Sequence, residues 1–339
     1  MTRVFHDEDT DPQALALDTV AVLGYGIQGR AQALTLRDSG VRVIVGNRPD
    51  RYRQLAEGEG FAVDDVGAAA RQGSLILVLL PDEVQPQILR EQVGPELQPG
   101  DGLVFAHGLA LRYGLIEPLP GTDVMLLAPR LPGQYLRQRY LDGWGVPAFV
   151  SVEQDATGRA WPRLLGLARA LGITRCAAIE LSAAQETELD HFSQHFLYPL
   201  VFRALEIAFD MLVEAGYPPE AALMELHGSG ELGQVLEAAG REGLYGMIRS
   251  HASPACQVGI AHHWHHAIGP EAEVRRRIQG VLDSIRDGRF ARHLFEQQER
   301  DYPELKGWAR AQSTALVEEE RRLKVMLNDR PSPPNSIHG

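Results

Sequence analysis

The chain contains 339 residues, of which 44% are hydrophobic and 23% are charged. This length exceeds one ordinary hydrophobic core and predicts two domains, and the apolar and charged fractions are typical of a soluble globular protein. Acidic residues outnumber basic ones by 45 to 33, and the formal net charge of −12 argues against a protein that binds nucleic acid or an anionic membrane.

The cysteine content and the start of the chain indicate the compartment. The two cysteines, Cys176 and Cys256, show no CxxC spacing and cannot form a disulfide framework, which favours a reducing cytoplasm. The first residues are acidic and lack the apolar core of an export signal. No uninterrupted apolar run reaches the length of a membrane span. We therefore expect a cytoplasmic protein of enzyme size.

Short apolar runs alternate with helix-forming stretches from residue 19 to about 180. Runs rich in β-branched residues, without in–out alternation, are typical of strands that are covered on both faces. The expected strands are Val20–Leu23, Val41–Val45, Leu75–Leu80, Leu103–Ala106, Val124–Leu127 and Ala148–Val152. Because helices are expected between them, residues 1–182 are predicted to form an α/β domain with a Rossmann-type, doubly wound parallel sheet.

The strand pattern ends after residue 182. Helix-forming residues with apolar side chains at helical spacing cover 186–214, 218–239, 271–288 and 303–326. A second, all-helical domain is therefore predicted over 183–326. The last residues, 327–339, hold three prolines and little to bury, which predicts a disordered tail.

A glycine-rich turn follows the first expected strand and opens a helix. It reads Gly24-Tyr25-Gly26-Ile27-Gln28-Gly29, which is GxGxxG at the start of the first βαβ unit. In this context one glycine makes the turn, one admits a pyrophosphate and one packs helix against strand, while the helix N-terminus offers N–H groups to the phosphates. The motif predicts dinucleotide binding; a merely tight strand–helix turn is the alternative.

The end of the second strand indicates which dinucleotide is bound. An acidic residue there would bind the ribose 2′-hydroxyl of NAD. The chain instead has Arg48, with Arg51 and Arg53 close behind, and these guanidinium groups can hold a 2′-phosphate. NADP is therefore favoured, and a solvated basic loop is the alternative.

Several motifs, in this order and spacing, resemble those of the short-chain, class I ketol-acid reductoisomerases. They are GYGIQGRAQALTLRDSG, LLPDEVQPQIL, FAHGL, LAPRLPG, ETELDHF and DGRFARHLFEQQ, spread over about residues 18–325. The resemblance implies a Rossmann domain, a knotted helical domain, and homodimers with intertwined helical domains. It also implies Mg²⁺-dependent alkyl migration on an acetohydroxy acid, then reduction by NADPH, a step in branched-chain amino-acid biosynthesis.

The resemblance also assigns site residues. The cofactor would be lined by Gly24 to Ile27, by Arg48, by the segment Asp82-Glu83-Val84-Gln85 and by Gly133. His107, in the FAHG motif after a strand, matches the active-site histidine of the family. A structural, hydrogen-bonding histidine is the alternative.

The positions that match the metal ligands of the family are altered. That family uses two pairs of carboxylates, each pair four residues apart on a helix, so that both members share a face. The chain has Asp190 and Gln194 at the first pair and, counted back from GLYGM, His227 and Glu231 at the second. Because two carboxylates balance one divalent cation, the two-metal site is predicted to be lost. Asp190, Glu231 and His227 would suit one ion such as Mg²⁺, Mn²⁺ or a softer metal, or none.

Two further positions differ from the family pattern. The PKGPG loop reads Pro129-Arg130-Leu131-Pro132-Gly133, and Arg130 can bind a carboxylate or stabilise an oxyanion but is a poor proton donor. The serine that binds substrate in the family falls on Ala252. Substrate recognition is therefore expected to have changed.

Together these differences predict an NADP-dependent oxidoreductase that reduces a small keto or imino acid without the usual isomerisation. Arg130 would bind the substrate carboxylate or polarise its carbonyl, and His107 would lie between cofactor and substrate. Asp190 and Glu231 would hold one metal or relay a proton. Two alternatives stay open: an ordinary ketol-acid reductoisomerase that tolerates the replacements, and an NADP-binding protein without catalysis.

Overall fold

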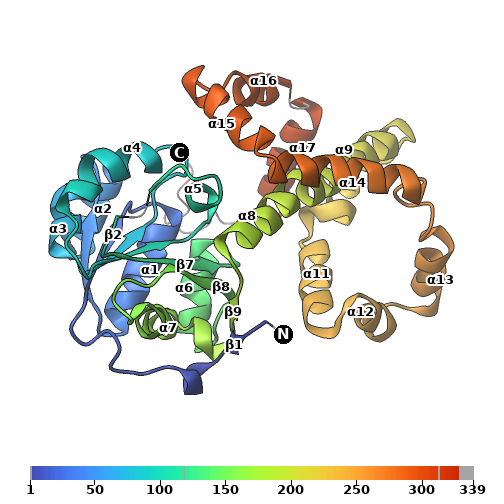
Figure 1. Ribbon diagram of the computed structural model, residues 1–339. Helices are drawn as coiled ribbons and strands as arrows, with labels where there is room; N and C mark the ends of the chain where they lie inside the picture. Colours follow the sequence, from blue (N-terminus) through green and yellow to red (C-terminus); the bar gives the residue numbers. More distant parts are fainter. Residues whose placement is uncertain (1, 118, 312–313, 328–339) are drawn as a thin grey trace. The chain divides into compact units, whose positions relative to one another are not determined.

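The computed structural model describes residues 2–117, 119–311 and 314–327 (Figure 1). The chain divides into two compact units, Met1–Asp190 and His191–Gly339. The boundary between the units lies inside helix α8 (Ala183–Phe192), and the division at residue 182 stays a prediction. Apart from its first residue, the predicted disordered tail lies outside the described residues.

The first unit contains a nine-stranded sheet in its described residues, in the order β1-β9-β8-β7-β6-β5-β2-β3-β4. Six of its eight strand pairs are parallel, which confirms the predicted Rossmann-type sheet. The strands are β1 (Val4–Phe5), β2 (Thr19–Leu23), β3 (Arg42–Gly46), β4 (Ala62–Asp64), β5 (Leu75–Val78), β6 (Gly102–Phe105), β7 (Asp123–Pro129), β8 (Ala148–Gln154) and β9 (Ala178–Glu180).

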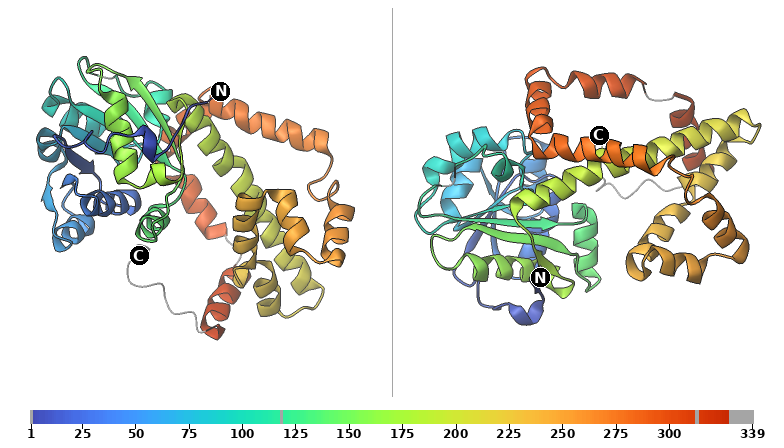
Figure 2. Two further views of the ribbon diagram at one scale, coloured as in Figure 1. Left: turned by 90° about the horizontal axis from the view of Figure 1, so that it is seen from below. Right: turned by 45° about the vertical axis from the view of Figure 1, so that its right-hand side comes forward.

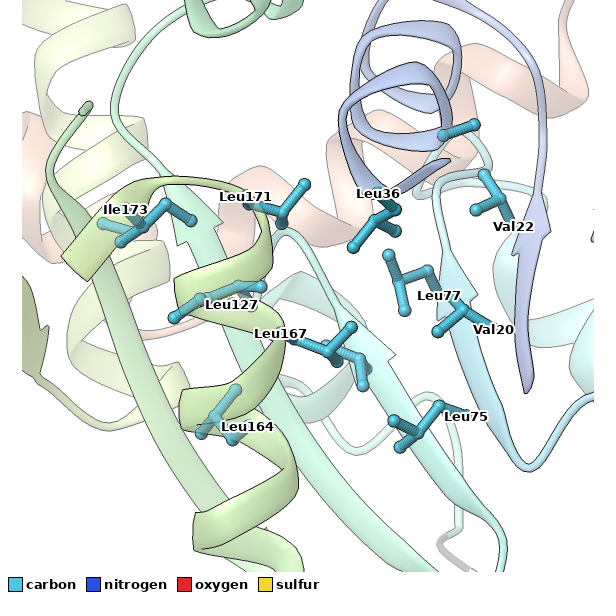
Figure 3. Packing of buried hydrophobic residues seen from close by; sticks show 14 of the residues in the cluster. Val20, Val22, Leu36, Leu75, Leu77, Leu127, Leu164, Leu167, Leu171 and Ile173 are labelled. Carbon is cyan, nitrogen blue, oxygen red and sulfur yellow. The ribbon is translucent and has the colours of Figure 1, made fainter. Parts of the chain in front are cut away.

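Helices cover both faces of this sheet, as Figures 1 and 2 show. Alternate side chains of β2 point to opposite faces, so Val20 and Val22 join one core and Ala21 and Leu23 join the other. Figure 3 shows the first core, where leucines of α1 and α7 lie against the strands. The helices of this unit are α1 (Ile27–Asp38), α2 (Arg51–Gly58), α3 (Val66–Gln72), α4 (Gln85–Ile88), α5 (Leu109–Arg112), α6 (Gly133–Leu141) and α7 (Ala160–Ala170).

Two strand pairs depart from the expected parallel arrangement: β1 with β9, and β7 with β8. After β7, helix α6 and residues 142–147 return the chain to the carboxyl end of β7, so that Ala148 pairs with Pro129. The backbone N–H of Arg130 then donates to the carbonyl of Pro147 at 2.9 Å. This return fixes the backbone of Arg130 at the carboxyl edge of the sheet.

A charged network is buried at the opposite, amino edge of the sheet. The guanidinium of Arg163, which is only 4% exposed, donates to Asp18 at 2.7 Å and to Asp123 at 3.3 Å. It also donates to the carbonyls of Ser74 at 2.8 Å and Gly100 at 2.9 Å. These residues precede or begin four different strands. The Arg163 side chain therefore links the amino ends of four strands by hydrogen bonds.

The second unit is built of helices in its described residues (Figures 1 and 2). The helical stretch predicted over 218–239 is interrupted at Gly230, which adopts a left-handed conformation with φ of 80° and separates two helical segments. The helices are α9 (Tyr198–Glu214), α10 (Pro219–Leu223), α11 (Glu231–Glu242), α12 (Leu244–His251), α13 (Pro254–His263), α14 (Glu271–Arg286), α15 (Arg289–Glu299), α16 (Pro303–Ala311) and α17 (Thr314–Met326). In the described part of the chain, no helix has both the length and the apolar character that a membrane crossing requires.

Candidate active site

The glycine-rich turn connects β2 to α1 at the carboxyl edge of the sheet. Gly24 has φ of 92°, and a Cβ atom there would lie 2.7 Å from the carbonyl oxygen of Leu79. A Cβ atom at Gly29 would lie 1.9 Å from the carbonyl oxygen of Gly24, so both positions require glycine. A Cβ atom at Gly26 would meet nothing within 4 Å, and Gly26 is the N-cap of α1. The open space therefore lies beside the helix N-terminus, where a phosphate binds most readily.

The side chain of Tyr25, expected to line the cofactor, points into the core instead. It is fully buried; its hydroxyl donates to Glu59 at 2.7 Å, and its ring meets that of Phe61 edge to face. Burial and the bond to Glu59 raise the pKa of Tyr25 above its ordinary value, so the hydroxyl stays a neutral donor. The backbone N–H donates to Asn47 Oδ1 at 3.0 Å. Tyr25 thus anchors the turn, and only its backbone can face the cofactor.

The three arginines after β3 differ in how firmly they are already paired. The Arg48 side chain is 84% exposed and donates to Asp50 at 2.9 Å. Asp50 also caps α2 by accepting two backbone N–H groups. Arg53 is bound to Asp65 at 2.7 Å and to a second carboxylate, whereas Arg51 is exposed. Arg48, which is 84% exposed and paired with one carboxylate, is therefore better placed than Arg53 to meet a 2′-phosphate.

The segment Asp82-Glu83-Val84-Gln85 forms a turn after β5 that leads into α4. Gln85 is only 3% exposed; its amide donates to the carbonyl of Leu80 at 2.8 Å and to Asp82 Oδ1 at 3.1 Å. Glu83 and Val84 are half-buried. The buried amide holds the Asp82 carboxylate in place at the carboxyl edge of the sheet.

A cluster of charged side chains lies at this same edge. His107 follows β6, and its Nδ1–H donates to Asp82 Oδ2 at 2.8 Å. Arg130 follows β7, and its two Nη atoms donate to Glu186 Oε1 at 2.7 Å and to Asp190 Oδ1 at 3.0 Å. The second ring nitrogen of His107 lies 3.6 Å from Asp190 Oδ2 and 4.0 Å from Glu186 Oε2. The structure therefore brings together three of the predicted catalytic residues, His107, Arg130 and Asp190.

Glu186 belongs to this cluster and was not among the predicted site residues. It lies four residues before Asp190 on α8, so the two carboxylates share one helix face. The same spacing rule that linked Asp190 to Gln194 could have found Glu186 on the N-terminal side. The backbone N–H of Gly108 donates to Glu186 Oε2 at 2.9 Å.

Burial and neighbouring charges set the ionisation of the cluster. Burial works against the charged form of His107, but Asp82, Glu186 and Asp190 outweigh it and raise the pKa of His107 to about 9. Burial raises the pKa of Glu186 above its usual value, and His107 and Arg130 act in the opposite direction. His107 is therefore a cation at neutral pH and can supply a proton.

The second unit holds the other predicted metal ligands, and there the expected helix face is wrong. His227 lies in a π-helical turn, η6 (Met224–Gly228), whereas Glu231 is the first residue of α11, beyond the left-handed Gly230. The two side chains therefore do not lie one turn apart on a continuous helix. His227 Nε2 lies 3.1 Å from a carboxylate oxygen of Glu320, so the imidazole is paired with α17.

The first pair belongs to two different helical elements. Asp190 lies on α8, whereas Gln194 lies in the π-helical turn η5 (Ser193–Leu197), which continues into α9. Gln194 also brings no charge to a metal.

Gly133 begins α6, where this helix approaches α1. A Cβ atom at Gly133 would lie 2.1 Å from the carbonyl oxygen of Ile27, and 3.1 Å from the side chain of Ala31. The absence of a side chain at Gly133 is thus required for contact between the two helices. Ile27, half exposed on the first turn of α1, lies next to this contact.

Comparisons with known proteins identify the family. A family model described as the NADPH-binding domain of acetohydroxy acid isomeroreductase matches residues 14–177, and one described as the C-terminal domain of ketol-acid reductoisomerase matches residues 184–328. A protein of Caldivirga maquilingensis named ketol-acid reductoisomerase (NADP(+)) is 40% identical, over 88% of this chain and 90% of its own length. A protein of the same name from Methanocaldococcus jannaschii is 37% identical, over 94% of this chain and 96% of its own length.

Solved structures agree with this assignment. An NADH-preferring ketol-acid reductoisomerase from an uncultured archaeal source has a TM-score of 0.90 and 32% identity, and the match covers 97% of this chain and 99% of that one. A pyrroline-5-carboxylate reductase of Coxiella burnetii, 13% identical with a TM-score of 0.56, covers 80% of this chain and 96% of its own and shares the fold alone.

The matches confirm the resemblance found in the motifs, and they confirm an NADPH-binding domain ahead of a helical domain. The carboxyl-edge glycine turn and the charged cluster lie where this fold class binds dinucleotide and substrate. The chain belongs to the ketol-acid reductoisomerase family of oxidoreductases.

Proposed function

We propose that this chain uses NADPH to reduce a small 2-oxo or imino acid and that it does not catalyse the preceding two-metal isomerisation. The observation that carries the proposal is the altered ligand set. Gln194 is neutral, and His227 is an imidazole paired with Glu320. Of the four positions that match the family's metal ligands, only Asp190 and Glu231 are carboxylates, and two carboxylates balance one divalent cation. The alkyl migration of the family needs two cations to polarise a ketone and its neighbouring alkoxide.

Reduction alone needs an electrophile and a proton source, and both stand in the charged cluster. NADPH supplies the hydride when it is bound. As the carbonyl π bond breaks, Arg130 stabilises the negative charge that develops on oxygen. His107, protonated at neutral pH, gives its proton to that oxygen, and a hydroxy acid results. Asp82 holds the imidazole so that its second nitrogen faces Glu186 and Asp190.

The role of Arg130 in binding a substrate carboxylate is less favoured by the geometry than a role in polarising the carbonyl. Two of its N–H groups already donate to protein carboxylates, of Glu186 and Asp190. A third carboxylate at the same guanidinium would crowd like charges. We therefore expect another group to bind the carboxylate of the substrate.

The complete ketol-acid reductoisomerase reaction is the second candidate. The names of relatives that are 37–40% identical over 88% or more of this chain favour it. A protein that binds NADP without catalysis is the third candidate. It predicts NADPH binding with no acceleration of NADPH oxidation by any keto acid.

NADPH oxidation by the purified full-length protein separates these candidates. With excess Mg²⁺, 2-acetolactate is offered in one assay and its rearranged product, 3-hydroxy-3-methyl-2-oxobutyrate, in a parallel one. We expect turnover of the rearranged ketone only. Rapid turnover of acetolactate would refute the loss of isomerisation, and inactivity towards both, with NADPH binding shown by fluorescence, would favour the non-catalytic candidate or another substrate.

A double variant gives a further test of the ligand argument. Gln194→Glu with His227→Glu restores the carboxylates of the family pattern. If the altered ligands cause the loss, the double variant gains acetolactate turnover in Mg²⁺, whereas Asp210→Asn on the exposed face of α9 gains none.

We also propose that the helical domains of two copies intertwine in a homodimer. Among the described residues of the second unit, one small cluster of buried apolar side chains is formed by Phe209, Ala222, Leu223 and Leu323. Large apolar side chains such as Phe202, Met211 and Trp308 are exposed. Exposed apolar surface of this kind is typical of a protein interface. Light scattering after size-exclusion chromatography should give twice the mass of the chain, and a single-chain mass would contradict the proposal.

A further inference from the structure

We propose that Arg130 takes the place of a divalent cation at the active site, so that the substrate carbonyl is reduced without a bound metal ion. The inference deepens the proposed function, because it names the electrophile of the reduction. The family implies Mg²⁺, and the side chains around Asp190 test whether such an ion fits here.

A set of metal-ligating atoms does converge in the first unit. Ligand atoms of His107, Glu186 and Asp190 all lie within 4.8 Å of one another. A cation attracted to this site would meet two carboxylates four residues apart on α8 and one imidazole. By residue type alone, the cluster could hold a metal such as Zn²⁺ or Mn²⁺.

Arg130 already occupies this position. One oxygen of each carboxylate accepts an N–H of its guanidinium, at 2.7 Å from Glu186 and 3.0 Å from Asp190. The other oxygen of Glu186 accepts the N–H of Gly108, and the other oxygen of Asp190 lies 3.6 Å from the His107 ring nitrogen. Each of the four carboxylate oxygens thus has a donor or a ring nitrogen of the protein within 4 Å.

The guanidinium is held firmly in this position. Its Nε–H donates to the carbonyl of Ala128 at 3.1 Å, and its central carbon lies 5.1 Å from the centre of the Phe149 ring. Arginine stays protonated at every physiological pH, so it cannot make room for a metal by losing its charge. The lysine that the family pattern has here could do so. A divalent cation between Glu186 and Asp190 would therefore lie next to a fixed positive charge.

The Arg130 guanidinium can polarise the substrate carbonyl as a metal cation would. It carries five N–H groups, and the contacts to Ala128, Glu186 and Asp190 use three of them. The remaining two, one on each Nη, can donate to the carbonyl oxygen of a substrate. Fixed donors of this kind stabilise a developing oxyanion without reorganising during the reaction.

The first test measures metal dependence in the full-length wild-type protein. NADPH oxidation with the 2-oxo acid found to be a substrate is compared after treatment with EDTA and after addition of 10 mM MgCl₂. We expect the two rates to agree within twofold. A loss of tenfold or more with EDTA, restored by Mg²⁺, would overturn the proposal. Isomerisation of acetolactate would refute the proposed function separately, because it is read from a different substrate.

The second test measures metal binding without turnover, with Mn²⁺ as the probe. The electron paramagnetic resonance signal of free Mn²⁺ should be unchanged by wild-type protein at 100 µM. In Arg130→Met, whose side chain can still pack on Phe149, the freed carboxylates should bind Mn²⁺ and reduce the signal. Tight Mn²⁺ binding by the wild type, or its loss in Arg130→Met, would contradict the proposal.

Activity of the variants completes the test. Arg130→Met should lose at least 100-fold in kcat for reduction while its Kd for NADPH changes less than threefold. Arg276→Met, which changes an exposed arginine on α14, should retain both. An Arg130→Met protein that binds NADPH and reduces the substrate at the wild-type rate would show that Arg130 is not the electrophile. If Arg130→Met does not fold, the wild-type EDTA and Mn²⁺ measurements still decide the question.

Discussion

Replacing Asp82 by asparagine should change the charge state of His107 and, with it, the pH range in which the protein is active. Asp82 accepts the Nδ1–H of His107 at 2.8 Å and is the first of the groups that raise its pKa. The Asp82→Asn change keeps the shape of the side chain and removes its charge. Burial disfavours the charged imidazolium, and in Asp82→Asn fewer carboxylates oppose this effect. The pKa of His107 therefore falls towards or below its ordinary value of 6.5.

The size of the effect follows from the pKa. A value of about 9 in place of 6.5 means that the folded protein favours the imidazolium by about 3 kcal/mol. Since the folded pKa lies above the unfolded one, this stabilisation is fully present below pH 6.5 and is lost as the pH rises through 9. The His107 side chain is only 18% exposed, so solvent screens the interaction weakly.

Two assays follow from this reasoning. In the pH profile of kcat/KM for NADPH oxidation, the wild type should lose activity as the pH rises through an apparent pKa near 9. In Asp82→Asn this loss on raising the pH should occur with an apparent pKa below about 7. In urea unfolding, a double-mutant cycle of Asp82→Asn and His107→Asn should give a coupling of roughly 2–3 kcal/mol at pH 6. The coupling should be clearly smaller at pH 10, where only the hydrogen bond from the neutral imidazole to the Asp82 carboxylate remains.

Asp210→Asn, an exposed aspartate on α9, is the matched control and should alter neither profile. A basic limb that stays near pH 9 in Asp82→Asn would refute the view that His107 is the proton donor held by Asp82. A coupling energy that does not change between pH 6 and pH 10 would refute the assignment of a positive charge to His107 below pH 9.

Three further predictions concern the first unit. Arg163→Met should lower the free energy of unfolding by about 3–5 kcal/mol, because it leaves two buried carboxylates without their cationic partner, and urea titration checks this. Gly133→Ala should raise the Kd for NADPH tenfold or more, as measured by fluorescence, because its Cβ would lie 2.1 Å from the carbonyl oxygen of Ile27 and must displace α1. Arg48→Ala should raise the Kd for NADPH but not for NADH, whereas Arg53→Ala, whose guanidinium is already bound to carboxylates, should change both little.

The local patterns of the sequence were sufficient for the parallel centre of the sheet in the first unit and for the glycine turn, but they did not predict the short strands β1, β4 and β9. Strands such as β2 and β5 are continuous apolar runs, and the requirement for glycine at Gly24 and Gly29 comes from residues near the turn and from the adjacent strand end. The antiparallel pair β7–β8 was not predictable. An apolar run predicts that a strand forms, but it does not predict whether the neighbouring strand runs parallel or antiparallel to it. The π-helical turns η5 and η6 likewise could not be predicted from the spacing of apolar residues.

By itself, the sequence determined which residue types were present: the glycine turn, the basic loop, and Arg130, Gln194 and His227 at positions where the resemblance to the family implies a lysine and carboxylates. Only the tertiary structure decided what these groups do. Arg130 meets Glu186 and Asp190 from 56 and 60 positions away, and His107 meets Asp82 from 25 positions away. Charge, pKa and metal affinity depend on distances through space and on burial, and these are fixed when the carboxyl ends of separate strands meet helix α8.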